Sequence, residues 1–247
     1  MSQQKNQIQV TDLPYSVSIV IPNYNQGHLI HRAIESAAMQ SYKNKEVVIV
    51  DDGSTDNSVE IIKRLIDEYK HLCKFTFIPK NNGGTASARN AGIKATKSNF
   101  VAFLDADDYY YPHKVAISIG KCIEYPGIGV VYSDYDIRGK DGIIRREFKE
   151  SFDFNKLIQR CIVSTNSIVA RTCFDKVGLF NESIKGMEDY EMWLRIATKF
   201  MLVHIPLSLF EYHEHGGNKT LTANLAEWME EERQMKTAFL KNHGFIQ

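Results

Sequence analysis

The sequence of 247 residues predicts an α/β fold built on a single, mostly parallel, doubly wound sheet flanked by helices. Two observations predict this class. Short apolar runs rich in β-branched and aromatic residues alternate with amphipathic segments over the first 105 residues, as strands alternate with helices in such folds. Three of these runs are followed at once by polar residues, and doubly wound sheets bind ligands at the carboxyl ends of their strands. We therefore expect a ligand site formed by residues 22–25, 51–54 and 105–108.

The first half of the chain alternates four predicted strands with three predicted helices. Each strand is a continuous apolar run, which indicates burial on both faces of a sheet. Each helix carries apolar residues at three- and four-residue spacing, which is typical of one buried face. The strands are expected at residues 17–21, 46–50, 75–78 and 100–104, and the helices at 29–38, 59–69 and 86–95.

The second half is less regular. Asn224 followed by Glu227 predicts a capping box at the start of the last helix, and Gly244 predicts its end. Strands are expected at 130–133, 202–205 and 207–212, the last two separated by Pro206, and helices at 188–200 and 224–242. The expected division is a flexible tail over 1–15, one domain over 16–222 with halves of 16–110 and 111–222, and a C-terminal helix within 223–247.

Composition excludes several classes of protein. Lys and Arg number 30 and Asp and Glu also number 30, and this zero net charge disfavours nucleic-acid binding. No run approaches the roughly 18 apolar residues of a membrane span. The N-terminal residues lack the apolar segment of a secretory signal, and the four cysteines include no Cys-x-x-Cys pair. We therefore expect free thiols and a cytoplasmic protein.

The most informative cluster is Asp105-Ala106-Asp107-Asp108, which follows a predicted strand. Three carboxylates within four residues repel one another unless a cation lies between them. Mg²⁺ and Mn²⁺ sites typically use one or two carboxylates, and phosphate oxygens of a substrate complete the shell. A turn or a helix N-cap explains the same residues about equally well, because Asp is favoured in both.

Two further segments suit a nucleotide. The carboxylate of Asp52 could accept a hydrogen bond from the N3–H of uracil or thymine, although a strand-to-helix turn is the simpler interpretation of residues 51–56. Gly83 and Gly84 would let the backbone approach a ligand closely, and Arg89 nearby suits phosphate. The segment is neither a Walker A loop nor Gly-x-Gly-x-x-Gly, so a dinucleotide fold is disfavoured.

Two later segments could contribute catalytic groups. Glu188 and Asp189 begin a predicted helix, where carboxylates complement the helix dipole; either could also act as a general base. His213 and His215 precede a Gly-Gly-Asn-Lys segment. Histidines there could bind a metal ion or phosphate, and the glycines would let a loop close.

Taken in order, these segments resemble the inverting, nucleotide-sugar-dependent glycosyltransferases of family 2, which have a Rossmann-like GT-A fold. Each motif alone is weak, but six in the family's order cover most of the chain. They are residues 17–25 (VSIVIPNYN), 48–56 (VIVDDGSTD), 82–92 (NGGTASARNAG), 103–108 (FLDADD), 188–195 (EDYEMWLR) and 215–218 (HGGN).

The resemblance implies a role for each matching residue. Pro22, with Tyr24 nearby, would pack on the nucleotide base, and Asp52 would bind uracil. Gly83, Gly84 and Arg89 would lie near the ribose and diphosphate. The Asp-x-Asp motif would contact the ribose through Asp105 and hold Mn²⁺ or Mg²⁺ through Asp107.

The resemblance also implies the reacting groups. The family's general base is an acid matched by Asp189, with Glu188 as the alternative, and His215 would reach the metal or diphosphate. Many members carry Arg two residues before that histidine, where this sequence has His213. This departure leaves open which group neutralises the leaving phosphates, and Lys219 could share that role.

The implied reaction is a single in-line displacement that inverts the anomeric carbon, with a UDP-sugar as the favoured donor. A sugar-nucleotide-forming nucleotidyltransferase is disfavoured because residues 22–25 are not the Gly-rich loop that such enzymes use. A non-catalytic nucleotide-sugar-binding protein is disfavoured because every expected carboxylate is present.

The acceptor is the least determined part of the reaction. A glycan or lipid-linked acceptor in bacterial surface polysaccharide synthesis is expected, with contacts from residues 132–136 and 164–166. The last helix carries four acids and three bases between residues 224 and 242, which disfavours an anionic membrane. Peripheral membrane association and a homo-oligomer remain open.

Overall fold

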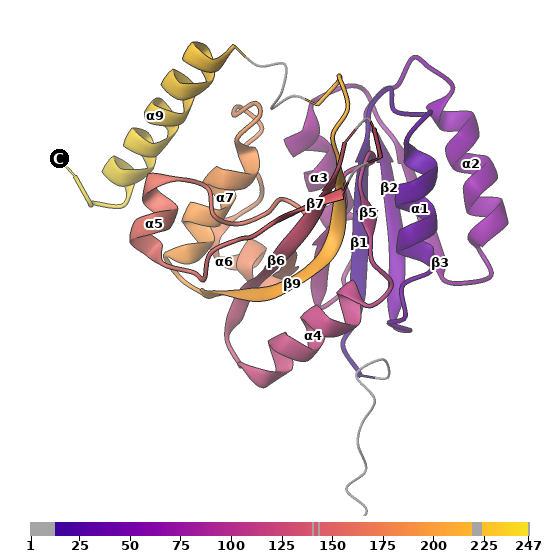
Figure 1. Cartoon of the computed structure of the whole chain (residues 1–247), viewed down its shortest axis with the longest axis horizontal. Helices are drawn as coiled ribbons and strands as arrows, with labels where there is room; N and C mark the ends of the chain where they lie inside the picture. Colours follow the sequence, from indigo (N-terminus) through magenta and orange to yellow (C-terminus); the bar gives the residue numbers. More distant parts are fainter. Residues whose placement is uncertain (1–12, 140, 143, 219–223, 247) are drawn as a thin grey trace, which may run out of the picture.

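A computed structural model describes residues 13–139, 141, 142, 144–218 and 224–246. It confirms the predicted fold class: one mixed sheet carries helices on both faces, and a helix closes the chain (Figure 1). The strands are β1 (Val17–Asn23), β2 (Lys45–Asp51), β3 (Lys74–Pro79), β4 (Phe100–Phe103), β5 (Tyr109–Tyr110), β6 (Ile128–Arg138), β7 (Ile144–Glu147), β8 (Ile168–Ala170) and β9 (Met201–His213). The helices are α1 (Ile30–Ala38), α2 (Ser58–Tyr69), α3 (Thr85–Lys94), α4 (Lys114–Glu124), α5 (Phe154–Gln159), α6 (Arg171–Val177), α7 (Glu188–Ala197) and α9 (Leu225–Asn242).

The sheet runs in the order β3-β2-β1-β4-β8-β6-β9-β5, and β7 pairs with β6. The β1–β2, β2–β3, β1–β4 and β6–β9 pairs are parallel. Antiparallel pairing is confined to those involving β5, β7 or β8. Because β1, β2 and β4 are parallel, the three segments singled out in the sequence follow strand ends at the same edge of the sheet.

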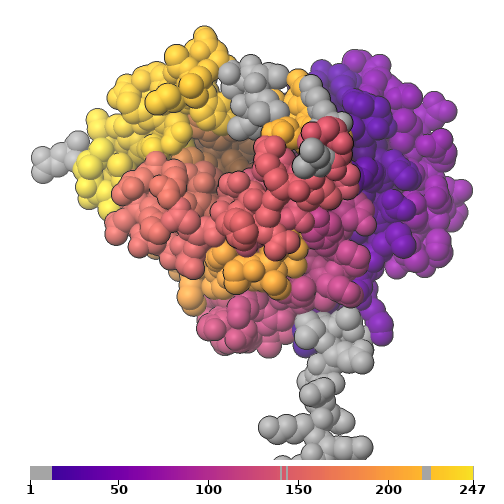
Figure 2. Space-filling model, viewed as in Figure 1, coloured from indigo at the N-terminus to yellow at the C-terminus, as the bar shows by residue number. Residues whose placement is uncertain are grey.

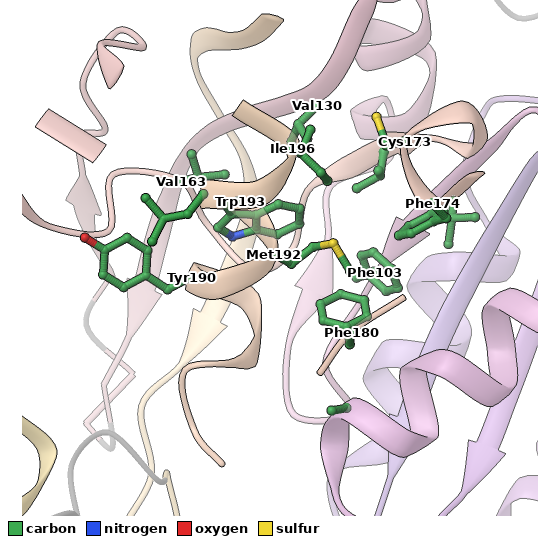
Figure 3. Close-up of a cluster of buried hydrophobic side chains, with 14 of the residues drawn as sticks. Phe103, Val130, Val163, Cys173, Phe174, Phe180, Tyr190, Met192, Trp193 and Ile196 are labelled. Carbon is green, nitrogen blue, oxygen red and sulfur yellow. The ribbon is translucent and has the colours of Figure 1, made fainter. Parts of the chain in front are cut away.

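Each face of the sheet has its own hydrophobic core. Along β1, Val17, Ile19 and Ile21 pack with α1, α2 and α4, whereas Val20 packs with α3 and α7 on the other face. The second core also receives Met235 and Phe239 of α9. Figure 3 shows part of it, with Met192 and Trp193 of α7 packed among Phe103, Val130 and Phe180.

One sequence prediction of secondary structure is wrong. Two short strands were expected on either side of Pro206, but β9 runs through it without a break. Pairing of β6 with β9 shifts register between Ser133 and Asp134, opposite Pro206 and Leu207. A bulge at that point leaves the extra residues unpaired, so the strand can accommodate a residue without an N–H donor.

The C-terminal helix begins and ends where the sequence predicts. The Asn224 side chain accepts a hydrogen bond from the Ala226 N–H and donates one to Glu227, and Gly244 follows the helix with φ +72°. Within the described residues no helix is long and apolar enough to cross a bilayer.

Candidate active site

A cavity of about 770 Å³ opens beyond the carboxyl ends of β1, β2 and β4. It receives groups from the first loop, the Gly-rich turn, the acidic cluster and the start of α7. The predicted site residues that line it are Pro22, Tyr24, Asp52, Gly84, Arg89, Asp105, Asp107, Glu188 and Asp189. Gly83 and His215 lie outside its lining but bond to residues that line it. Lys219 falls outside the described residues.

Asp52 organises the Gly-rich turn at one end of the cavity. Its side chain is 3% exposed, and its Oδ1 accepts hydrogen bonds from Lys80 Nζ at 2.6 Å and the Gly83 N–H at 3.0 Å. Its Oδ2 accepts from the N–H groups of Gly83 and Gly84, the latter at 2.7 Å. A carboxylate offers about four acceptor positions. The N3–H of a base would therefore compete with Lys80, which the sequence analysis did not single out.

The acidic cluster separates into groups with different environments. Asp107 has a side chain that is 13% exposed and accepts a hydrogen bond from His215 Nε2 at 3.0 Å. Burial and the charge of Asp105 raise its pKa. Asp108 is buried and accepts hydrogen bonds from Asn166 and the His213 N–H, and burial with the charge of Asp107 raises its pKa well above the usual value. Asp107 thus faces the cavity, whereas Asp108 joins the loops around it.

Of the predicted site residues, Asp107 and His215 form the pair that could hold a divalent cation. Among the described residues no three His, Cys, Asp or Glu side chains are grouped to enclose a metal ion. One carboxylate beside one imidazole nevertheless suits Mn²⁺, when phosphate oxygens of a ligand supply the rest of the shell.

Arg89 bridges the acidic cluster and α7. Its guanidinium, 3% exposed, donates from Nη1 to Glu188 Oε1 at 2.9 Å and from Nη2 to Asp105 Oδ1 at 2.8 Å. It also lies against the rings of Phe103 and Phe180. The side chain therefore neutralises two carboxylates from inside the protein.

Glu188 and Asp189 are adjacent but have different partners. Glu188 is bound by Arg89 and accepts a hydrogen bond from the Gly186 N–H. Asp189 accepts hydrogen bonds from the Thr165 hydroxyl at 2.6 Å and from the Tyr190 N–H at 2.8 Å. Burial, followed by the charge of Glu188, raises the pKa of Asp189. Asp189 therefore has neutral hydrogen-bond donors, whereas Glu188 is ion-paired.

Residues before β8 hydrogen-bond both to the acidic cluster and to Asp189 of α7. Thr165 bonds to Asp189, while Asn166 accepts a hydrogen bond from the Asp105 N–H and donates one to Asp108. The sequence predicts contacts between this segment and the acceptor. A polar triplet before an apolar strand does not specify which side chains the triplet bonds.

The sequence profile of glycosyl transferase family 2 matches residues 18–174. The Escherichia coli UDP-Glc:alpha-D-GlcNAc-diphosphoundecaprenol beta-1,3-glucosyltransferase WfaP is 30% identical over 236 residues, which cover 93% of this chain and 89% of that protein. The uncharacterized glycosyltransferase RP339 of Rickettsia prowazekii is 31% identical over a match that covers 91% of this chain and 71% of that protein. Other relatives are longer: the chain spans 34% of a Rickettsia felis glycosyltransferase and 21% of the Pasteurella multocida chondroitin synthase.

Solved structures share the fold. S. aureus TarS 1–349 in complex with UDP-GlcNAc superposes with a TM-score of 0.75 at 21% identity, over 92% of this chain and 67% of that one. The mannosyltransferase PcManGT of Pyrobaculum calidifontis, in complex with GDP-Man and Mn²⁺, superposes with a TM-score of 0.71 at 18% identity. The match covers 96% of this chain and 66% of that one.

Proposed function

The chain belongs to glycosyl transferase family 2 and is a nucleotide-sugar glycosyltransferase, and from this premise we propose its finer chemistry. It transfers a sugar from UDP to a hydroxyl group of a glycan or lipid-linked acceptor and inverts the anomeric carbon. The observation that carries the proposal is that three predicted site carboxylates meet in one place. Asp52, Asp107 and Asp189 come from three distant segments of the chain, yet they line one cavity.

Asp189 is the general base. The acceptor hydroxyl attacks C1 of the donor sugar and gives its proton to Asp189, while the bond from C1 to the diphosphate oxygen breaks and UDP leaves with the electron pair. The raised pKa of Asp189 brings it closer to that of a useful base near neutral pH. Thr165 orients the carboxylate. Glu188 is less suited because its carboxylate is already held by the Arg89 guanidinium and the Gly186 N–H.

The leaving diphosphate needs positive charge. Asp107 and His215 would hold Mn²⁺ or Mg²⁺ beside it, and such a cation, when bound, stabilises the charge on the departing phosphates. Asp105, ion-paired to Arg89, would face the ribose. Lys219 would be a further residue that neutralises the leaving phosphates.

The donor base would bind between the first loop and the Gly-rich turn. Tyr24 is 49% exposed at the cavity edge and, with Pro22, offers a surface against which a planar base can pack. Asp52 would accept the N3–H of uracil in place of one of its present donors.

The relative WfaP carries the name of an enzyme with a diphosphoundecaprenol-linked acceptor, and it matches this chain over nearly its whole length. This relative favours a lipid-linked acceptor over a free glycan, and we propose such an acceptor in surface polysaccharide synthesis. Peripheral association with the inner face of a membrane follows from it as a prediction.

A thermal-shift panel tests the donor site. UDP, TDP, GDP and CMP are each added with Mn²⁺ or with EDTA. A ligand at a hundred times its Kd stabilises a protein by about 2.7 kcal/mol, which a melting curve resolves. We expect a shift with UDP that is larger in Mn²⁺ than in EDTA. A shift with GDP alone would contradict the role of Asp52. Inversion is tested separately by the configuration of the product: an α-linked product from an α-linked donor would contradict it.

A further inference from the structure

The C-terminal helix α9 contributes to the same cavity as the predicted base. Trp228 and Glu232, one turn apart on α9, line it together with Asp189. We propose that Trp228 is the platform on which a pyranose ring of the acceptor stacks, and that it helps to select the acceptor. This inference rests on the proposed function, because it names the acceptor side of the same site.

Trp228 faces the protein body although its helix lies at the edge of the molecule. Met235 and Phe239, seven and eleven residues later, are 8% and 5% exposed and anchor α9 in the core that contains α7. Those spacings return to the same face of a helix, so Trp228 points toward the protein body. It packs against this core and remains partly exposed.

The indole lies directly on the turn that precedes the base. A Cβ added to Gly186 would meet Trp228 Cζ3 at 2.8 Å, so only glycine lets the ring approach so closely. The Gly186 N–H donates to Glu188, the residue before Asp189. The ring thus lies beside the start of α7, where the acceptor hydroxyl must arrive to give up its proton.

The two ends of the cavity differ in chemistry. Tyr24 and Asp52 directly follow β1 and β2, whereas Figures 1 and 2 place α9, in yellow, on the opposite side of the molecule. At this second end Arg160 and Glu232 accompany the indole. A pyranose has an apolar C–H face and a polar hydroxyl edge. The electron-rich face of the indole suits the C–H face of the sugar, and the charged side chains can hydrogen-bond to its hydroxyl groups.

Trp228 and Glu232 lie beyond the segment that the family profile matches. The family profile ends at residue 174, and α9 begins at Leu225. A residue that selects the acceptor is expected on such a segment, because residues outside the family profile can differ between its members.

Kinetics separates acceptor from donor binding. Trp228→Ala and Trp228→Phe are compared with Met229→Ala, a matched control whose side chain is on the same helix, 61% exposed and outside the cavity lining. Acceptors are p-nitrophenyl glycosides of glucose, galactose and N-acetylglucosamine, and the same sugars linked through diphosphate to undecanol. The two series distinguish a free glycan from a lipid-linked sugar.

We expect Trp228→Ala to raise the acceptor KM about tenfold in whichever series is used, which corresponds to about 1.4 kcal/mol of lost binding. Trp228→Phe should recover most of this loss. The donor KM and the slow hydrolysis of UDP-sugar without acceptor should not change in any variant. An acceptor KM that is unaltered in Trp228→Ala would overturn the proposal.

Fluorescence tests binding without turnover. The chain has two tryptophans, and Trp193 is fully buried, so changes on adding a ligand report Trp228. In protein saturated with UDP and Mn²⁺, an accepted glycoside should protect Trp228 from acrylamide, and the Trp228→Phe variant should lack this response. Absence of protection by every glycoside, in protein that UDP does stabilise, would overturn the inference alone. Absence of a UDP shift would instead count against the proposed function.

Discussion

At the residue scale, the two neighbouring acids of α7 have different chemistry because of one arginine. Arg89 pairs with Glu188 and Asp105, both of which lie beside the cavity, and leaves Asp189 with neutral donors. Burial raises the pKa of Asp189, whereas the oxygens of Glu188 are held by Arg89 and the Gly186 N–H. The separation of roles between Glu188 and Asp189 therefore depends on a side chain that is 3% exposed.

Asp189→Asn is expected to lower kcat by at least a hundredfold, because positioned general bases typically contribute 10²- to 10⁴-fold. UDP binding and the melting temperature should change little. Glu188→Gln should have the opposite profile: it leaves Arg89 with one fewer charged partner, so the protein should melt lower while retaining more activity. Steady-state rates and melting curves of both variants decide the assignment. A larger loss of kcat in Glu188→Gln would identify Glu188 as the base.

Lys114 should make stability depend on pH. Its ammonium is buried against the rings of Tyr110 and Phe210, and burial lowers its pKa to about 7. The unfolded chain, with an ordinary lysine pKa, binds the proton up to about pH 10. Between these values the unfolded state holds more protons, so this residue makes stability rise with pH. Lys114→Met should remove that rise and stabilise the protein at pH 7 by an amount on the order of 3 kcal/mol.

Denaturant unfolding of both proteins from pH 6.5 to 9.5 measures this effect. The difference between the two curves removes the contribution of the other titrating groups. A constant difference across this range would show that Lys114 keeps its ordinary pKa in the folded protein.

At the element scale, the position of α3 depends on its close approach to β1. A Cβ added to Gly92 of α3 would meet Val20 Cγ1 of β1 at 2.4 Å, and Val20 is fully buried. The spacing of helix α3 from the sheet sets where Arg89, on the same helix, reaches Glu188 and Asp105. A glycine in the middle of a helix, otherwise unfavourable, is explained here by packing.

Gly92→Ala should therefore destabilise the protein by about 1–3 kcal/mol, as overpacking does in other cores. This sign is informative, because the same change in an open helix stabilises by roughly 0.5–1 kcal/mol. Val20→Ala in the same chain should recover part of the loss by making space. Lys94→Ala, exposed on the same helix, is the control. Urea unfolding of the four proteins tests the packing argument, and a Gly92→Ala variant more stable than wild type would refute it.

At the scale of the whole molecule, the predictable parts were those that local patterns determine. Continuous apolar runs predicted β1, β2 and β4, and polar residues after them predicted where the cavity lies. Contacts between distant segments carry no local pattern. Neither the bond from Thr165 to Asp189 nor the approach of Trp228 to Gly186 could be predicted from one sequence. The predicted break at Pro206 was wrong because a bulge accommodates the proline within β9. A bulge depends on the partner strand, which the local sequence does not specify.

The acidic cluster relates the stability of the whole molecule to its ligands. Asp105 is ion-paired to Arg89, but burial and then the neighbouring carboxylates raise the pKa of Asp107 and Asp108. Such a concentration of like charge destabilises the folded chain at pH 7, where the unfolded carboxylates are fully ionised at no cost. A cation bound with a nucleoside diphosphate should reverse that effect.

Asp107→Asn should accordingly melt higher than wild type in EDTA, by an amount on the order of 1 kcal/mol, because a buried carboxylate beside other carboxylates is removed. The same variant should lose most of the additional stabilisation that Mn²⁺ gives wild type in the presence of UDP. Thermal melts of both proteins in EDTA, in Mn²⁺, and in Mn²⁺ with UDP measure the two effects together. If Mn²⁺ and UDP stabilise Asp107→Asn as much as wild type, the cation is bound elsewhere and the pairing of Asp107 with His215 is structural only.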